Sequence, residues 1–204
     1  MTAQSAAAWR VRDWRRRTAT LYDQVRSAPD PAQGHAMWVE GRDRLLSGHP
    51  ASPVPPDQRD GFRAHVAPYD PAFRFSVQVG AALSERREVP TPADGVVPFE
   101  RIGRVDLPGL GGLDLWWLDS YGGGIFLPIR DSSSGSVTYG GGRYVLDTVK
   151  GADLGGDVDT LVIDLNFAYQ PSCAYSSDWV CPLPGRGNTL AAPVPVGELN
   201  VHVT

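Results

Sequence analysis

Hydrophobic residues near the N-terminus recur at the spacing of a helix. They are separated by alternating steps of three and four, and arginines occupy the remaining face. This pattern predicts an amphipathic helix over residues 3–27 that ends before Pro29. The recurring positions are Val11, Trp14, Thr18, Leu21 and Val25.

A second helical pattern covers residues 31–47. Gly48 and Pro50 follow its last apolar positions, which is a usual way for a helix to end. Further prolines at 53, 55 and 56 indicate an ordered connector. The apolar positions of this helix are Met37, Trp38, Val39, Leu45 and Leu46.

From about residue 73 the pattern changes to short apolar runs bounded by Gly, Pro and Asp, which indicates strands. Turn signals recur roughly every 8–15 residues, and no helix alternates with the strands. We therefore predict a mainly β protein, α+β overall: an antiparallel β-barrel or barrel-like sandwich preceded by two N-terminal helices. The runs are FRFSVQV, VVPFERIGRVDL, LDLWWLDSY, GIFLPIRD, RYVLDTV and TLVIDLNFAY.

The chain thus divides into a basic, amphipathic helical arm at 1–30 and a single β-rich domain at 31–204. The formal charge of −4 argues against a nucleic-acid partner, because neutralising phosphates requires a clustered excess of Lys and Arg. The N-terminus lacks the apolar core of a secretory signal, and no stretch approaches the about 18 apolar residues of a membrane span. These features predict a cytoplasmic protein without a membrane partner; the oligomeric state stays open.

Two long and compositionally unusual blocks allow a family to be named. They read IFLPIRDSSSGSVTYGGGRYVLD and DLNFAYQPSCAYSSDWVCPLPGRGNTL, followed by PVPVGEL. With the upstream pieces MWVEGRDRLLSGHPASPVP and FRAHVAPYDPAFRF, the chain resembles the bacterial and archaeal family catalogued as domain of unknown function 1684, from about residue 36 to 198. The resemblance implies membership but neither an activity nor a cofactor.

A glycine-rich turn, Tyr139-Gly140-Gly141-Gly142, stands directly before Arg143. Glycine permits close backbone approach, so a ligand or another chain segment is expected against it. Arg143 offers a planar fork suited to a carboxylate or phosphate. The alternative is a tight hairpin whose arginine pairs with an internal acid such as Asp131 or Asp164.

In the run DLNFAY, a continuous strand places Asp164 and Asn166 on one face. Two polar residues in so apolar a strand indicate either ligand contacts in a barrel mouth or a satisfied structural network. Tyr169, Tyr175 and Asn188 are further candidate ligand contacts, with ordinary loop packing or turn capping as the alternative.

Cys173 and Cys181 are the only cysteines. Inert thiols, a redox pair and a catalytic nucleophile all remain open for them. Closing the ring as a disulfide has a stabilising effect on the order of 2–3 kcal/mol. No metal site is predicted, because the compact CxxC knuckle is absent.

Together these residues predict the binding of a small polar or anionic molecule in a β-barrel mouth, with Arg143 as anchor and thiol-assisted chemistry at Cys173 or Cys181 as an open option. Whether the protein is an enzyme is not decided by the sequence. The alternative is a non-catalytic scaffold or interaction protein that uses the arginine-rich helix of the arm: Arg10, Arg12, Arg15, Arg16 and Arg17.

Overall fold

Two helices open the chain in the computed structural model, which describes residues 2–91, 95–158 and 160–200. Helix α1 spans Ala3–Arg26 and helix α2 spans Pro31–Gly48, as the spacing of apolar residues predicts. Each begins at a side chain that accepts a hydrogen bond from the first turn: Thr2 from the Ser5 amide and Asp30 from the Gln33 amide. Neither described helix is long and apolar enough to span a membrane.

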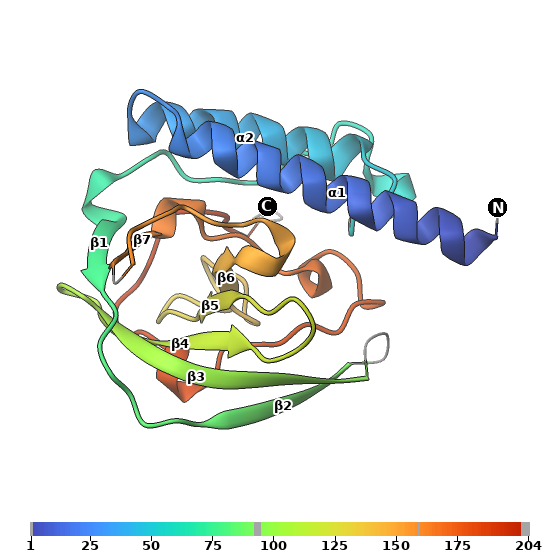
Figure 1. The fold of residues 1–204 in the computed structure, drawn as a ribbon. Coiled ribbons are helices and arrows are strands. Elements are labelled where there is room, and N and C mark those ends of the chain that lie inside the picture. Colours follow the sequence, from blue (N-terminus) through green and yellow to red (C-terminus); the bar gives the residue numbers. More distant parts are fainter. Residues whose placement is uncertain (1, 92–94, 159, 201–204) are drawn as a thin grey trace.

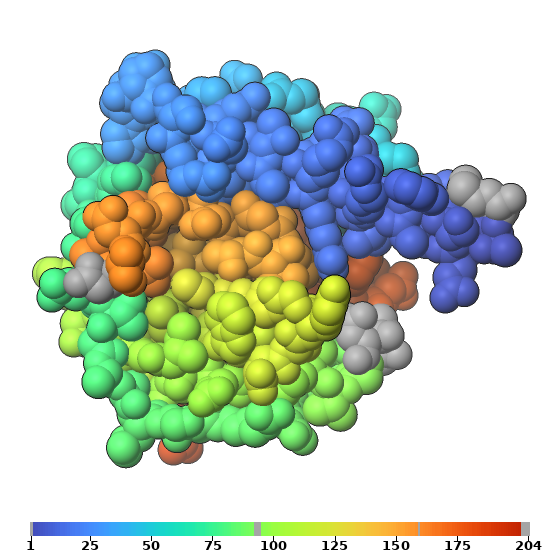
Figure 2. Space-filling model, in the orientation of Figure 1, coloured from blue at the N-terminus to red at the C-terminus, as the bar shows by residue number. Residues whose placement is uncertain are grey.

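The two helices lie side by side across one side of the molecule (Figure 1). Their close contact depends on Gly41, where an added Cβ would lie 2.5 Å from a methyl carbon of Leu21. The indole nitrogen of Trp38 donates to the hydroxyl of Tyr22 at 3.2 Å. The second half of α1 is therefore part of the core, whereas its first turns extend past the body (Figure 2).

Opposite the helices lies a five-stranded antiparallel sheet in the order β2-β3-β4-β5-β6 (Figure 1). A separate antiparallel pair, β1 with β7, lies at its side. The larger sheet consists of β2 (Arg86–Thr91), β3 (Gly95–Leu107), β4 (Gly111–Leu118), β5 (Ile125–Ile129) and β6 (Arg143–Asp147), and the pair of β1 (Arg74–Gln78) and β7 (Thr160–Asp164).

The prediction of a mainly antiparallel β protein preceded by two helices is confirmed. Closure into a barrel is not observed within the described ranges. Beyond β6 the described chain adds isolated bridges, Tyr144 with Tyr169 and Asp147 with Ala152, and β2 carries a proline that suits an outer strand. The molecule is instead layered, with its main core between the helices and the sheets.

The main core cluster contains Trp38, Phe167 and aliphatic side chains of β3 to β7. A smaller cluster on the same sheet gathers Phe99, Trp116, Phe126 and Tyr144. Trp116 is buried and the adjacent Trp117 is 38% exposed, which follows from the alternation of side chains along a strand.

Two local expectations differ from the structure. The run DLNFAY is not one strand: β7 ends at Asp164, whose carboxylate accepts from the Asn166 amide and starts a turn of 3-10 helix at Leu165–Phe167. Asp164 and Asn166 therefore do not share a strand face. Strand β2 was not predicted, because its sequence RREVPT is charged and contains proline.

Candidate functional site

Other segments of the same chain pack against the glycine-rich turn. At Gly142, with φ of 85°, an added Cβ would lie 2.6 Å from the ring of Pro184 and 2.7 Å from the carbonyl oxygen of Ile129. The Gly142 amide donates to the carbonyl of Tyr139 at 2.8 Å, which closes the turn. The sequence predicts either a ligand or another chain segment against this turn, and the structure has the chain segment.

Arg143 lies in the interior, with 1% of its surface exposed. One terminal nitrogen donates to Asp131 at 3.1 Å and to the carbonyl of Val194 at 2.8 Å, and the other to the carbonyls of Val196 and Glu198. Both terminal nitrogens of the guanidinium are therefore occupied, and their hydrogen bonds hold the C-terminal segment against β6. This is the internal pairing with Asp131, and it leaves Arg143 unsuited to anchor a ligand.

Asp164 and Asn166 form a second buried network. Asp164 accepts from Arg74 at 3.0 Å, and the side-chain amide of Asn166 both accepts from the amide and donates to the carbonyl of Asp70, each at 2.8 Å. The carbonyl of Asn166 is 3.1 Å from the ring nitrogen Nε2 of His35. This network fastens the segment before β1 to the turn after β7.

Asn188 is also fully buried and saturated. Its amide nitrogen donates to the carbonyls of Asp114 at 2.8 Å and Pro128 at 2.9 Å, while its oxygen accepts from the indole of Trp116 at 2.8 Å. It joins the turn at Arg186–Asn188 to β4 and β5, and it does not lie with Arg143 or Asp164 in one site.

Three of the predicted residues do meet at a cavity, namely Tyr169, Tyr175 and Cys181. It has a volume of about 90 Å³ and lies between the helices and the segment after β7. We call it the interlayer pocket. Six aromatic side chains line it: Trp14 and Tyr22 from α1, Trp38 from α2, and Tyr144, Tyr169 and Tyr175 from the β domain.

Arg42 of α2 is one of the charged residues that line the interlayer pocket. One terminal nitrogen donates to Glu198 at 2.8 Å and to the hydroxyl of Tyr175 at 2.9 Å, and the guanidinium lies 4.8 Å from the centre of the Tyr169 ring. Its Nε is buried and has no hydrogen-bond partner among the described residues. This N–H is a donor left open beside a cavity.

The charge of Arg42 is fixed by its surroundings. Burial lowers its pKa, but the adjacent Glu198 carboxylate outweighs burial, so the pKa lies above its ordinary value. Glu198 itself has a side chain that is 2% exposed and accepts from the amide of Gln170 at 2.6 Å and from the hydroxyl of Tyr175. Burial raises the pKa of Tyr175 well above its ordinary value, so this phenol remains a hydrogen-bond donor at neutral pH.

A second ion pair borders the same pocket, with Lys150 donating to Asp147 at 2.8 Å. Two ion pairs therefore border the pocket. Among its described lining residues, the Nε–H of Arg42 is the buried side-chain group that has no hydrogen-bond partner. No group of three or more His, Cys, Asp and Glu suited to a metal ion occurs in the part of the chain that the structure describes.

The sequence contains a signal for Arg42, which is not among the predicted site residues. It follows Trp38 by four residues, so it lies on the buried face of α2. An arginine within the apolar face of a helix requires an internal partner, and Glu198 lies far along the chain.

The two cysteines are free, half-buried thiols at the edge of the interlayer pocket. Burial and the neighbouring Cys181 thiol raise the pKa of Cys173 to about 11. A catalytic nucleophile needs a lowered pKa. The arrangement therefore does not favour a thiol nucleophile.

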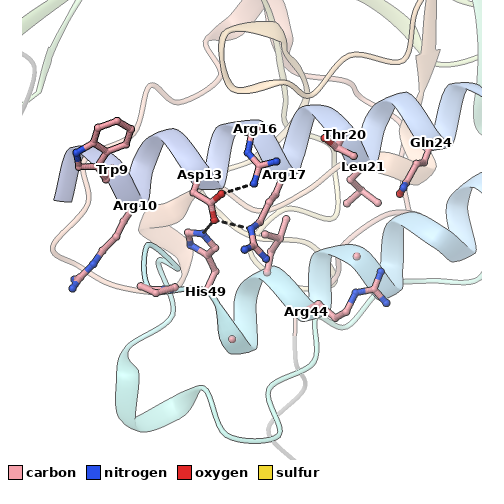
Figure 3. A pocket seen from close by; sticks show the side chains of 14 residues that line it. Trp9, Arg10, Asp13, Arg16, Arg17, Thr20, Leu21, Gln24, Arg44 and His49 are labelled. Carbon is pink, nitrogen blue, oxygen red and sulfur yellow. Dashed lines mark hydrogen bonds and ion pairs between the residues drawn. The ribbon is translucent and has the colours of Figure 1, made fainter. Parts of the chain in front are cut away.

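A larger and more open groove, of about 760 Å³, runs between α1 and α2 (Figure 3). We call it the arginine groove, because Arg10, Arg16, Arg17 and Arg44 line it beside a single acid, Asp13. Asp13 binds Arg16 at 2.8 Å, Arg17 at 2.7 Å and the Nε2 of His49 at 3.2 Å. Hydrogen bonds from Arg16 and His49 hold the pKa of Asp13 well below its usual range.

Comparisons with known proteins agree with the resemblance seen in the sequence. A family model described as "Protein of unknown function (DUF1684)" matches residues 62–199. The solution NMR structure of an uncharacterised protein of Haloarcula marismortui is similar, with 32% sequence identity and a TM-score of 0.57 over 81% of this chain and 92% of that one. No curated protein matches the sequence significantly.

Proposed function

This chain belongs to the family of proteins of unknown function DUF1684, and from the geometry of its own site we propose that it binds a small polar or anionic molecule in the interlayer pocket. Arg42 is the anchor. Its Nε–H donates to a carboxylate or carbonyl oxygen of the ligand. The observation that carries the proposal is that Arg42 lines a cavity and that its buried Nε–H has no hydrogen-bond partner among the residues that the structure describes.

An unpaired buried donor favours a ligand because leaving it unpaired is costly. Burying a polar group without a hydrogen bond costs about 1–3 kcal/mol, and more when the group is charged. A ligand oxygen at Nε removes this cost, while Glu198 and Tyr175 keep the guanidinium in place from its other end. The anchor is therefore preorganised before the ligand arrives.

The size and walls of the interlayer pocket define the class of ligand. A volume of about 90 Å³ is well below that of a site for a drug-sized molecule, which is roughly 300–1,000 Å³. Aromatic rings surround the polar end, so a ligand with one acceptor group and a short apolar part fits best. Small monocarboxylates are the first class to test.

The experiment is titration calorimetry with formate, acetate, propionate and lactate against the wild type and Arg42→Lys. Lysine keeps the positive charge for Glu198 but lacks the Nε donor. We expect wild-type binding and at least a tenfold weaker affinity in Arg42→Lys. The matched control is Arg44→Lys, because Arg44 lies on the same helix with its side chain 71% exposed. Equal binding by the wild type and Arg42→Lys, or no binding to the wild type, contradicts the proposal.

The arginine groove supports a second candidate, an interaction surface for an acidic segment of a protein partner. Four arginines line it against one acid that already has three partners, and Trp9 at its end is 58% exposed. This charge imbalance complements an acidic peptide.

Charge reversal separates this candidate from the first. Arg10→Glu with Arg44→Glu changes two residues lining the groove, and Arg12→Glu changes α1 outside it. With a synthetic oligoglutamate peptide as probe, affinity is expected to fall at least tenfold in the double variant, to fall far less in Arg12→Glu, and to weaken with salt. Equal losses in both variants contradict a specific groove.

A further inference from the structure

The two cysteines of the chain lie against each other at the edge of the interlayer pocket. The amide nitrogen of Cys173 donates to the sulfur of Cys181 at 3.4 Å. Both are free and half-buried. A disulfide requires the two residues to approach each other, and this contact brings the Cys181 sulfur against the backbone of Cys173.

The segment between the cysteines carries a residue that positions the anchor of the pocket. The hydroxyl of Tyr175 donates to Glu198 and accepts from Arg42 at 2.9 Å, and Cys181 lines the pocket itself. The rest of the segment is held less firmly, since Trp179 and Val180 are 46% and 50% exposed. Linking its ends restricts the chain on both sides of Tyr175.

We propose that Cys173 and Cys181 form a reversible disulfide that fixes segment 173–181 and so tightens the contact of Tyr175 with Arg42 and Glu198. The pair is thus a site of thiol–disulfide exchange whose oxidation adjusts the interlayer pocket. The effect on ligand affinity rests on the proposed function; formation of the disulfide does not.

The exchange uses a small-molecule disulfide as oxidant. One protein thiol loses its proton and its sulfur attacks the small disulfide, which forms a mixed disulfide and releases one small thiol. The second protein thiolate then attacks the protein sulfur of the mixed disulfide and releases the second small thiol. The protein loses two protons and two electrons, which reduce the small disulfide to two thiols.

The burial of the pair shapes the kinetics of this reaction. Since the pKa of Cys173 is raised to about 11, its thiol is protonated at neutral pH and the first attack is slow. The second attack is intramolecular between touching groups, so the mixed disulfide does not accumulate.

The test incubates the full chain with oxidised glutathione and follows it by intact-mass spectrometry and thiol alkylation. We expect a product lighter by two hydrogens in which neither thiol is alkylated, and full reversal by reduced glutathione. Cys173→Ser and Cys181→Ser should instead stop at the glutathione adduct. A stable adduct on the wild type, or two thiols that stay alkylatable after long incubation, overturns the proposal.

A second measurement tests the coupling to the pocket without any ligand. The amide of Gln170 donates to Glu198, so its hydrogen exchange reports on the network of Tyr175. We expect at least tenfold slower exchange at Gln170 after oxidation and little change at Arg104, whose amide bonds Gly80 in a distant bridge. An unchanged Gln170 overturns the coupling, and failure of carboxylates to bind affects only the proposed function.

Discussion

Two arginines of this protein, Arg143 and Arg42, differ in how fully their hydrogen-bond donors are used; their side chains are 1% and 13% exposed. Each pairs with a carboxylate, Asp131 in one case and Glu198 in the other. Arg143 also donates to three carbonyl groups of the C-terminal segment. Arg42 lines a cavity and retains a buried Nε–H that has no hydrogen-bond partner in the described part of the chain.

The difference between them separates a structural arginine from a candidate binding residue. A saturated guanidinium contributes to stability and has little left to offer a ligand. A guanidinium held at one end and open at the other is positioned for recognition, at a cost to stability when the pocket is empty. Saturation of the hydrogen-bond donors therefore distinguishes the two arginines.

The largest expected effect is on stability at Arg143. Replacing Arg143 by Met leaves Asp131 as an unpaired buried charge and releases three carbonyls, so we expect a loss of about 3–5 kcal/mol in the free energy of unfolding. Urea denaturation measures it. A loss below about 1 kcal/mol would mean that the Arg143 cluster does not hold the C-terminal segment.

A pH effect follows from the same cluster. Burial alone raises the pKa of Asp131, but hydrogen bonds from Ser133 and the charge of Arg143 outweigh it, so the pKa is lowered from 3.8. The stability from this carboxylate is therefore complete above the unfolded pKa and lost as the pH falls through the folded value.

Asp131→Asn should accordingly be less stable at pH 7 and lose less stability than the wild type on acidification. Unfolding free energies at a series of pH values from neutral down to about 2 measure this. Identical pH profiles for the two proteins would remove Asp131 from the acid response.

At the interlayer pocket the expected stability effects are smaller. Tyr175→Phe removes the hydroxyl that bonds Glu198 and Arg42, and we expect a loss of about 1–2 kcal/mol. Tyr121→Phe is the control, since Tyr121 is fully exposed. Equal stability of Tyr175→Phe and the wild type would show that this network is not formed in solution.

The smallest expected effect on stability is at Arg42→Lys. Because lysine keeps an ion pair with Glu198, we expect a loss of about 1 kcal/mol, compared with about 2–3 kcal/mol for Arg143→Lys, which loses several bonds to carbonyls. Chemical denaturation of both variants gives the ranking. The reverse order would contradict the distinction between the two arginines.

The sequence predicts the helices well because their signals are local. Apolar spacing and the prolines at 29 and 50 bound α1 and α2 to within two residues of the observed ends. The strands after residue 95 also follow from runs that alternate or are wholly apolar. Two expectations fail. The predicted continuous strand ends at Asp164, whose side chain starts a turn, and the charged outer strand β2 is not predicted. In both places polar interactions outweigh the hydrophobic pattern.

The candidate site depends on contacts between distant parts of the chain, which periodicity does not encode. Glycines before an arginine suggested a ligand site, but Pro184 fills the space beside Gly142. Tyr169 and Tyr175 were identified, whereas Arg42 was not, since its partner Glu198 lies in the C-terminal segment. The sequence thus locates part of the wall of the pocket and misses its anchor.

The most direct test of the central claim is an NMR titration that follows the Nε–H resonances of arginine. On addition of the tightest-binding small carboxylate, the Arg42 Nε–H is expected to shift progressively and to saturate, while that of Arg143 stays in place. The side-chain signals of the two residues are assigned from Arg42→Lys and Arg143→Lys. An Arg42 resonance that does not move while other residues shift would place binding elsewhere and contradict the role of Arg42 as anchor.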